Sequence, residues 1–199
     1  FAPGAAAAPA PGRAAPGGGA APAATAGAAP VARPPNVEYQ AAAHKWLVEN
    51  QTREQGVVEV VVEDKNQSVY IYNCNDATIN ITGKCKGVCV DGCKKARVLL
   101  DTTVSSLEFV NCQRVQAQVR GTVPSVAIDK TDGLLLYLSA ESLGATLTTS
   151  KSSEMNLSVP GPGGADDQVE IPIPEQFVHR IVPGPNPSVT SEVSDLYSG

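Results

Sequence analysis

Aromatic residues and long apolar runs are scarce in this sequence of 199 residues. Only 5% of the residues are aromatic, and there is one Trp and one Met. A conventional globular core would contain more of these large side chains, so the sequence predicts a core of another kind. No stretch approaches the roughly 18 consecutive apolar residues of a membrane-spanning helix. We therefore expect no membrane span.

Positive charge is not in excess either. The 15 Lys and Arg residues and the 20 Asp and Glu residues give a formal net charge of −5. Because nucleic-acid binding depends on cations that neutralise phosphates, this balance argues against a nucleic-acid partner. The sequence also lacks the basic and apolar regions of a secretory signal, and we expect a cytoplasmic protein.

The five cysteines do not form a disulfide framework, because their number is odd and the chain is long. This usage fits a reduced, cytoplasmic setting. Cys85, Cys89 and Cys93 have the spacing C-x3-C-x3-C, which invites comparison with a zinc site. In a strand, however, Cys89 would point away from its apolar neighbours Val88 and Val90. We therefore expect neither a metal site nor a cofactor.

What the sequence does contain is an internal repeat of 19 residues. A fixed period with apolar positions two residues apart is typical of a β-solenoid. The sequence predicts an all-β fold, namely a right-handed parallel β-helix of about six coils that begins by residue 58. Four apolar ladders define the repeat: Val69, Val88, Leu107, Val126 and Ala145; Ile71, Val90, Phe109, Ile128 and Leu147; Ile79, Val98, Ala117, Leu136 and Met155; and Ile81, Leu100, Val119, Leu138 and Leu157.

Short polar corners separate the predicted strands. They are rich in Asn, Asp and Gly, which tolerate turn and left-handed backbone. An inward ladder is expected at these corners, formed by Cys74, Cys93, Cys112, Thr131 and Ser150. Charged residues follow the same corners: Asp91, Lys94, Lys95, Arg114, Lys130, Asp132 and Lys151. Such a stripe suggests an acidic partner surface, although ordinary solvated corner charges would give the same pattern.

Alternation also predicts which side chains face solvent on the second strand of each repeat. Leu99, Leu135 and Tyr137 should be exposed neighbours, with a rim formed by Arg97, Gln116, Gln118 and Arg120. Asp101, Ser139 and Ser158 should also face outward. An exposed apolar patch is either an interaction surface or is covered by a C-terminal segment of the same chain, and the sequence leaves both possibilities open.

The two ends of the chain differ from the repeat. Residues 1–36 are almost entirely Ala, Pro and Gly, so we expect a disordered linker before a folded domain at 37–177. Pro-rich segments can bind aromatic grooves, which makes profilin or an SH3-type module a candidate partner of this linker. A flexible spacer is the simpler interpretation.

Beyond Pro160 the repeat stops. Residues 161–169 are expected to form a loop, and residues 170–177 an extended segment, because Pro172 and Pro174 exclude a helix or a central strand. The β-prone runs 178–182 and 189–193 flank a Pro/Gly turn and predict a hairpin within residues 178–199. An isolated hairpin is only marginally stable, so it should pack on its own solenoid or on a second copy of the chain.

Several motifs carry a family resemblance. In order they are K-W-x-V-E-N-Q at 45–51, S-V-Y-I-Y at 68–72, V-D-G-C-K-K at 90–95, K-S-S-E-M-N at 151–156 and P-E-Q-F at 174–177. Over residues 37–199 the sequence closely resembles the C-terminal domain of the cyclase-associated proteins. The resemblance implies a parallel β-helix that dimerises by exchanging C-terminal hairpins. It also implies a cytosolic actin regulator that binds monomeric ADP-actin and promotes exchange of ADP for ATP.

The resemblance further implies which residues act. The actin-binding residues would be Asp91, Lys94, Lys95, Lys130, Asp132, Lys151, Ser152, Ser153 and Glu154. The dimerisation hairpin would include Val178, Ile181, Val182, Val189 and Val193. The final residues 194–199 depart from the family pattern, and the chain shows no basic Leu-Lys-Lys-type motif of a WH2 module.

An enzymatic alternative is a GTPase-activating protein of the tubulin-binding cofactor C type, which shares this kind of β-helix and inserts an arginine finger. Arg114 and Arg120 are the arginines that could serve, but Arg114 lacks the flanking pattern expected of a finger. A β-helix carbohydrate hydrolase or lyase would need clustered carboxylates on one exposed face, and no such Asp pair is found. We therefore expect that the protein is not an enzyme.

Overall fold

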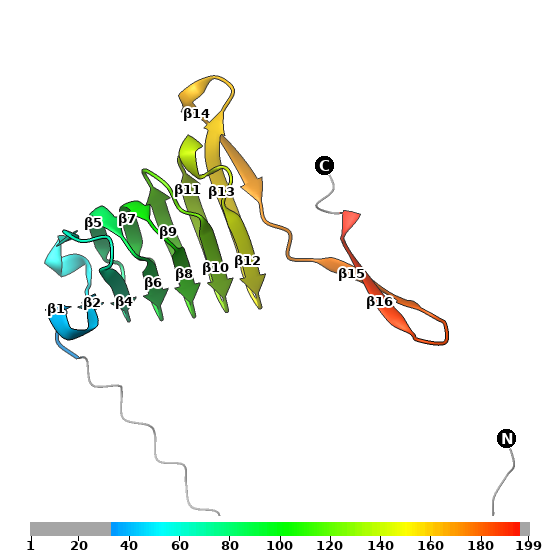
Figure 1. Cartoon of the computed structure of the whole chain (residues 1–199), viewed down its shortest axis with the longest axis horizontal. Coiled ribbons are helices and arrows are strands. Elements are labelled where there is room, and N and C mark those ends of the chain that lie inside the picture. The colour runs from blue at the N-terminus through cyan, green and yellow to red at the C-terminus, as the bar shows by residue number, and fades with distance from the viewer. Residues whose placement is uncertain (1–32, 196–199) are drawn as a thin grey trace, which may run out of the picture. The chain divides into compact units, whose positions relative to one another are not determined.

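The fold is a stack of parallel β-coils, described here from a computed structural model that covers residues 33–195. Residues 1–32 and 196–199 lie outside the described residues, so most of the predicted linker, with its profilin or SH3-type partner, stays a prediction. Seven strands form the first sheet, in the order β1 (Asn36–Gln40), β2 (Lys45–Glu49), β4 (Ser68–Tyr72), β6 (Val88–Asp91), β8 (Ser106–Val110), β10 (Ser125–Asp129) and β12 (Thr146–Ser150) (Figure 1).

The second sheet closes each coil. Its order is β14 (Gly164–Pro172), β13 (Ser153–Gly161), β11 (Asp132–Leu138), β9 (Gln113–Val119), β7 (Arg97–Thr103), β5 (Thr78–Cys85) and β3 (Val57–Val61). Neighbouring strands of successive coils are parallel, and only β1 and β14 pair antiparallel at the two ends. The predicted parallel β-helix of about six coils is confirmed.

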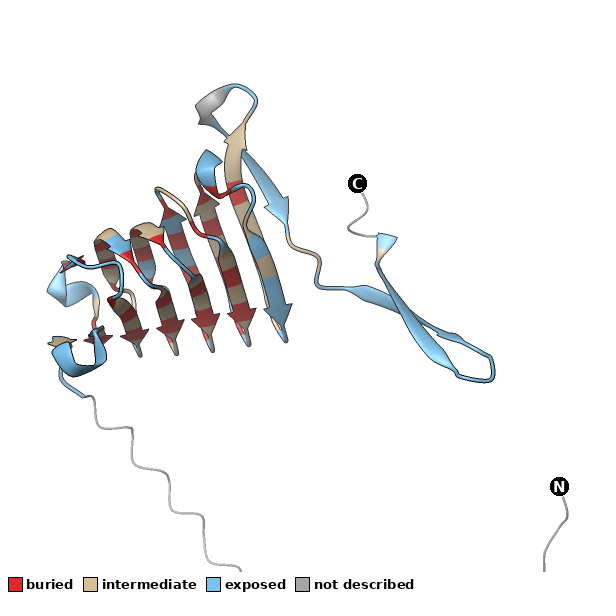
Figure 2. Ribbon diagram, viewed as in Figure 1, coloured by how far each residue is buried: buried red, intermediate tan, exposed pale blue. Residues whose placement is uncertain are grey.

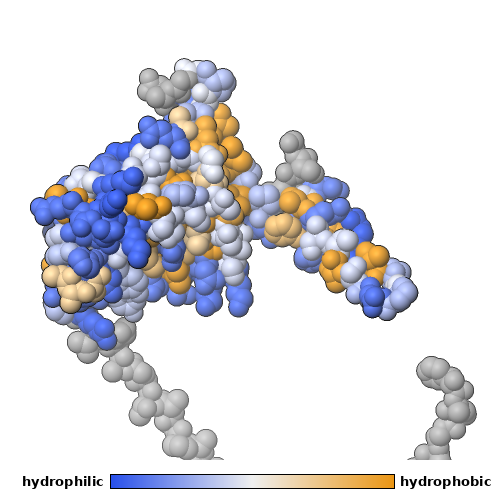
Figure 3. Space-filling model, in the orientation of Figure 1, coloured by the Kyte–Doolittle hydropathy of each residue, from blue (hydrophilic) through white to orange (hydrophobic). Residues whose placement is uncertain are grey.

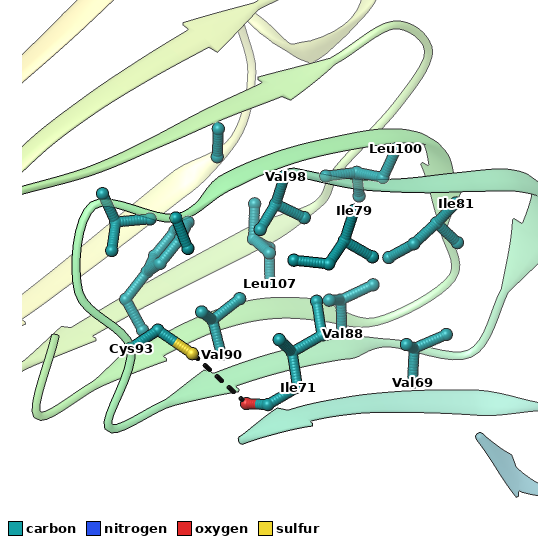
Figure 4. Packing of buried hydrophobic residues seen from close by; sticks show 14 of the residues in the cluster. Val69, Ile71, Ile79, Ile81, Val88, Val90, Cys93, Val98, Leu100 and Leu107 are labelled. Atoms are coloured by element: carbon teal, nitrogen blue, oxygen red, sulfur yellow. Dashed lines mark hydrogen bonds between the residues drawn. The ribbon is translucent and has the colours of Figure 1, made fainter. Parts of the chain in front are cut away.

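The core lies between the two sheets, and its composition follows from strand alternation. Along β4, Val69 and Ile71 are buried while Tyr70 and Tyr72 are half-buried on the outside. Val88 and Val90 repeat this arrangement one coil later and face Val98 and Leu100 across the interior (Figure 4). Buried and outward positions alternate in the same way through the stack (Figure 2). Val, Ile and Leu therefore fill a core that needs few aromatic residues.

The predicted 19-residue period holds only in the middle of the stack. There Val69 pairs with Val88, and Val88 with Leu107. At the C-terminal end Val126 pairs with Leu147 instead of the predicted Ala145, a step of 21. At the N-terminal end Val58 pairs with Ile79 instead of Ala77, which is again a step of 21.

Longer corners explain both departures. The corner between β9 and β10 comprises residues 120–124, whereas that between β11 and β12 comprises residues 139–145 and contains the 3-10 helix η3 (Ala140–Ser142). At the other end, η2 (Arg53–Gln55) occupies the longer corner between β2 and β3. Because each insertion has an even number of residues, the inward and outward faces of the strands are preserved.

From β4 onward, the first corner of each coil carries two residues with left-handed backbone, whereas the corner after β2 carries one, Asn50. One row comprises Asn50, Asn73, Gly92, Asn111, Lys130 and Lys151, and the other comprises Asp76, Lys95, Arg114, Gly133 and Glu154. An inward side chain lies between the two rows and hydrogen-bonds to the backbone of adjacent coils. Thus the Thr131 hydroxyl accepts the amide of Cys112 at 3.3 Å, and the Ser152 hydroxyl accepts the amide of Thr131 at 3.1 Å.

The last member of this inward ladder was predicted wrongly as Ser150. Ser152 occupies the position, because the longer corner before β12 shifts the register by two residues. Cys74, Cys93 and Cys112 are all buried in the ladder as predicted, and the Cys74 amide points to the Cys93 sulfur at 3.4 Å.

The predicted loop at 161–169 is also wrong. Residues 164–172 form β14, which pairs antiparallel with β13 through a tight turn. Pairing with the free edge of β13 decides this structure, which the polar, glycine-rich local sequence does not indicate. As a result Ser158, predicted to face solvent, is only 1% exposed, and its hydroxyl donates to Gln168 Oε1 at 3.1 Å.

The predicted C-terminal hairpin is confirmed. β15 (Phe177–Val182) pairs antiparallel with β16 (Ser188–Val193), and every residue of both strands is exposed. Phe177, Ile181, Val189 and Val193 share one face of this hairpin, because directly paired residues project to the same side. Within residues 33–195 no helix has the length and apolar character needed to cross a membrane.

A stability prediction follows from the packing of Phe109, the largest fully buried side chain of the core. We expect Phe109→Ala to lower the free energy of unfolding by about 3–5 kcal/mol, because it leaves a cavity between two rigid sheets. Urea unfolding followed by circular dichroism measures this. The exposed control Gln116→Ala should change the value by less than about 0.5 kcal/mol. If Phe109→Ala and Gln116→Ala lowered the free energy of unfolding equally, the assignment of Phe109 to the core would be contradicted.

Candidate functional site

The predicted binding residues gather along one edge of the solenoid, at the corners that follow β6, β10 and β12. These corners lie at the arrowheads of the strands in Figure 1. We call the outward residues there the corner stripe: Asp91, Lys94, Lys95, Lys130, Asp132, Lys151, Ser153 and Glu154. Lys94 bridges to Gln113, Gln113 pairs with Asp132, and Asp132 pairs with Ser153. Successive coils are about 4.8 Å apart, so Lys94 and Ser153 are separated by about 14 Å along the edge.

The lysines of the stripe are free to interact. Lys94, Lys95 and Lys151 are exposed, and in the part of the chain that the structure describes they form no salt bridge. Lys130 is 3.8 Å from the Asp129 carboxylate, a long contact that leaves its charge largely solvated.

Three lysines of the stripe also have left-handed backbone conformation. Lys95, Lys130 and Lys151 have φ values of 52°, 48° and 49°, in the left-handed region where a side chain costs roughly 1 kcal/mol or more. Gly92 and Gly133 occupy the equivalent positions in other coils. Lysine therefore occupies positions at which glycine would cost less backbone strain. This indicates that the charged side chains have a function.

The remaining stripe residues are more constrained. The Ser153 hydroxyl donates to Asp132 Oδ1 at 2.6 Å, which fixes both side chains. The Glu154 amide donates to Glu175 Oε2 at 2.9 Å, so the P-E-Q-F segment is tied to the last corner. Ser152 does not belong to the outward stripe. Its hydroxyl points inward and donates to the Ser150 carbonyl at 2.9 Å.

The predicted patch of Leu99, Leu135 and Tyr137 lies on the outer face of the second sheet. All three side chains are half-buried, and Gln116 and Gln118 of β9 separate Leu99 from the other two. A shallow hollow of about 780 Å³ adjoins Tyr137 and is lined by Leu138, Leu143 and Pro160 among others. Apolar side chains gather over the C-terminal coils in Figure 3. In the described structure β14 lies beside β13 and does not cover the patch.

The outer face of the first sheet holds a cluster that the sequence analysis missed. Tyr70 and Tyr72 stack with ring centroids 6.1 Å apart, and Lys45 Nζ lies 5.7 Å from the Tyr70 centroid. The Tyr70 hydroxyl donates to Asp91 Oδ2 at 2.7 Å, and this hydrogen bond, with burial, raises the pKa of Tyr70 well above its usual range. Alternation alone could have placed both rings on this face, but not their stacking or the bond to Asp91.

The cysteines point where alternation predicted. Cys85 and Cys93 are fully buried, whereas Cys89 faces outward between Tyr70 and Glu108. Burial, together with the charges of Glu108 and Asp91, raises the pKa of the Cys89 thiol to about 11. The described residues contain no group of three or more His, Cys, Asp or Glu side chains that could hold a metal ion.

The two candidate arginine fingers are placed differently. Arg120 Nε donates to Asp101 Oδ1 at 2.7 Å and Arg120 Nη2 to the Ile81 carbonyl at 3.3 Å, so its guanidinium is already engaged. Arg114 is exposed in the left-handed row, and a Cβ added at Gly133 would approach its Cα at 3.3 Å. Arg120 borders the hollow beside Tyr137, but its guanidinium would have to give up its contacts with Asp101 and the Ile81 carbonyl to act as a finger. The GTPase-activating alternative is not favoured.

Comparison with known families settles the kinship of this chain. The family described as "Adenylate cyclase associated (CAP) C terminal" matches residues 33–196, nearly the whole described structure. The chain belongs to the cyclase-associated protein family. An adenylyl cyclase-associated protein of Dictyostelium discoideum is 45% identical over 134 residues, which cover 67% of this chain and 29% of that protein.

Other members of the family agree. Cyclase-associated protein 1 of Arabidopsis thaliana is 41% identical over 153 residues, 76% of this chain and 31% of that protein. The chain therefore spans less than a third of the length of these curated relatives. A crystal structure of the cyclase-associated protein from Cryptosporidium parvum superposes with a TM-score of 0.75 at 30% identity, covering 81% of this chain and 96% of that one. The predicted family and fold are both confirmed.

A labelling prediction follows from the placement of the thiols. Iodoacetamide should modify native protein at Cys89 alone, because the other four cysteines are buried. With a thiol pKa of about 11, the rate should rise about tenfold per pH unit from pH 8 to 10. Mass spectrometry of tryptic peptides measures both. A labelling rate that levels off near pH 9 would contradict the raised pKa of Cys89. Modification of Cys74, Cys93 or Cys112 before Cys89 would contradict their burial. Cys89→Ser serves as the unlabelled control.

Proposed function

We propose that this chain binds monomeric ADP-bound actin and promotes exchange of ADP for ATP on it, so that actin monomers are recycled in the cytoplasm. The proposal rests on one observation above others. A chain of the cyclase-associated protein family carries exposed lysines at the motifs on which its resemblance to actin-binding members depends, and Lys94, Lys95 and Lys151 form no salt bridge within the described residues.

The chemistry of the stripe fits an acidic protein surface. Lys94, Lys95 and Lys151 offer unpaired ammonium groups, and the stacked coils hold them at fixed separations. A rigid array of this kind binds without ordering a loop first, which lowers the entropic cost of association. Asp91, Asp132 and Glu154 add acceptors along the same edge, which would make binding selective for one arrangement of charges.

Nucleotide exchange requires no covalent chemistry from this chain. An exchange factor must bind actin more tightly when the nucleotide cleft is open than when it is closed around ADP, since only differential affinity can accelerate release. A stiff solenoid suits this task, because it can hold one part of the partner surface in place and does not deform to follow it.

Dimerisation is proposed for the C-terminal hairpin. The hairpin is a separate two-stranded sheet, and Ile181 and Val189 are 78% and 63% exposed on its apolar face. At the same time β12 is an edge strand of the first sheet, and Leu147 on its inward face is only half-buried. The end of a solenoid must be capped, because its edge strand has unpaired backbone groups. A hairpin from a second copy would cap β12 and would bury its own apolar face at the same time.

The exchange proposal predicts a charge-specific defect. We expect the full chain to accelerate release of a fluorescent nucleotide from ADP–actin, and the double variant Lys94→Ala/Lys95→Ala to weaken binding about tenfold or more, because two unpaired cations are lost. The matched control Lys65→Ala/Lys84→Ala removes two exposed lysines at the opposite corner and should leave binding unchanged within about twofold.

Two outcomes would count against this function. Binding without acceleration would make the chain a sequestering module, and absence of binding would remove the actin proposal altogether. Equal losses from both double variants would show that net charge and not the corner stripe determines affinity. A rise in ionic strength should weaken wild-type binding more than that of the Lys94/Lys95 variant.

The dimer proposal has its own test. Ile181→Asp places a charge on the apolar hairpin face and should convert the protein from two chains to one in sedimentation equilibrium at micromolar concentration. Thr190→Asp introduces the same charge on the opposite hairpin face and serves as the control. A wild-type protein that sediments as a single chain would refute dimerisation.

A further inference from the structure

The outer face of the first sheet has a regular chemical pattern of its own. We call it the tyrosine face and define it by two rows that the strand register sets side by side. The rows are Leu47, Tyr70, Cys89 and Glu108, and Glu49, Tyr72, Asp91, Val110 and Asp129. The corner stripe shares only Asp91 with this face.

Stacked tyrosines make the face rigid. The planes of Tyr70 and Tyr72 are inclined by only 8°, and the bond from the Tyr70 hydroxyl to Asp91 holds the first ring in place. Lys45 already lies over Tyr70, which shows that this face accommodates a cation against an aromatic ring. Tyrosine offers a large contact area with few torsions to restrict, which favours it at binding surfaces.

Negative charge surrounds the rings. Glu49, Asp91 and Glu108 form no salt bridge in the described part of the chain, and accept hydrogen bonds only from neutral groups such as Asn36, Tyr70 and Ser106. Asp129 has Lys130 at 3.8 Å. The raised pKa values of Tyr70 and Cys89 have these carboxylates among their causes, which is consistent with a negative potential over the face.

The spacing of the carboxylates restricts the partner. Along the second row Glu49, Asp91 and Asp129 alternate with Tyr72 and Val110. Carboxylates two coils apart are therefore separated by about 10 Å, with an apolar side chain between them. In a polyproline II helix every third residue faces the same side at a spacing of about 9.3 Å, which matches this row closely.

We propose that the tyrosine face binds an extended segment of a partner protein that carries Arg or Lys at every third position. The cations pair with Glu49, Asp91 and Asp129, and the intervening proline or other apolar residues pack on Tyr72 and Val110. Arginine suits the site better than lysine, since its planar guanidinium can stack on Tyr72 while it binds a carboxylate. This interaction lies beyond actin binding and uses a different face.

The proposal is tested with the full chain and a fluorescein-labelled peptide, Arg-Pro-Pro repeated three times with blocked ends. We expect saturable binding by fluorescence anisotropy. Tyr72→Ala should weaken it at least tenfold and Asp129→Asn about threefold, while Tyr137→Ala on the second sheet should change it less than twofold. Circular dichroism and the unfolding midpoint establish that each variant is folded, and Asp129→Asn, a surface change, keeps the test valid if Tyr72→Ala unfolds.

Two control peptides separate spacing from charge. A peptide with three consecutive arginines followed by six prolines should bind at least fivefold more weakly, and the citrulline version of the repeat should not bind. Equal binding of the consecutive and spaced peptides would overturn the proposal. So would wild-type protein that binds the spaced peptide no more tightly than Tyr72→Ala and Asp129→Asn do. If the wild-type chain fails to bind the spaced peptide but still promotes nucleotide exchange, this inference alone is overturned, since exchange is assigned to the corner stripe.

Discussion

Hydrogen bonds between successive coils fix the geometry of the surfaces of the solenoid. Strands β2 to β13 pair in parallel with their counterparts in neighbouring coils, so a side chain inside the stack has its neighbours at about 4.8 Å in both directions. The register accommodates insertions both at a bulge in β5, between Ile81 and Lys84, and in the corners. Two extra residues in a corner are accommodated at both ends of the solenoid, because an even number keeps apolar side chains inside.

The corners that follow the first sheet are where the backbone is strained and where the corner stripe lies. To turn from the first sheet to the second, the corners from β4 onward use two left-handed residues around one inward side chain, and that side chain satisfies backbone groups which the turn would otherwise leave unpaired. Cys, Thr and Ser serve equally well inside. Outside, the same turns project Lys95 and Lys151 away from the body, so the strained backbone also presents the charges of the corner stripe.

Charge is segregated on this solenoid although the chain as a whole is only moderately acidic. The corner stripe holds the four lysines Lys94, Lys95, Lys130 and Lys151 beside three carboxylates, whereas the adjacent tyrosine face is acidic, with Asp91 at their boundary. A rigid body with two adjoining surfaces of different charge can bind two chemically different partners without rearranging. The family membership and the β-solenoid are established by comparison, whereas the partners of both surfaces are proposed from their chemistry.

By itself the sequence determined the class of fold, since the alternation of Val, Ile and Leu at a nearly constant interval is typical of a stack of coils. It also determined the C-terminal hairpin, through β-prone runs around a proline-rich turn, and placed the lysines on a common edge. Tertiary structure decided the rest. Only pairing with the edge of β13 makes residues 164–172 a strand and buries Ser158. Only the longer corners place Ser152, and not Ser150, in the inward ladder. Only the stacking of coils brings the Tyr70 hydroxyl within hydrogen-bond distance of the Asp91 carboxylate. These features depend on which segments become neighbours, and no local pattern in the sequence encodes that.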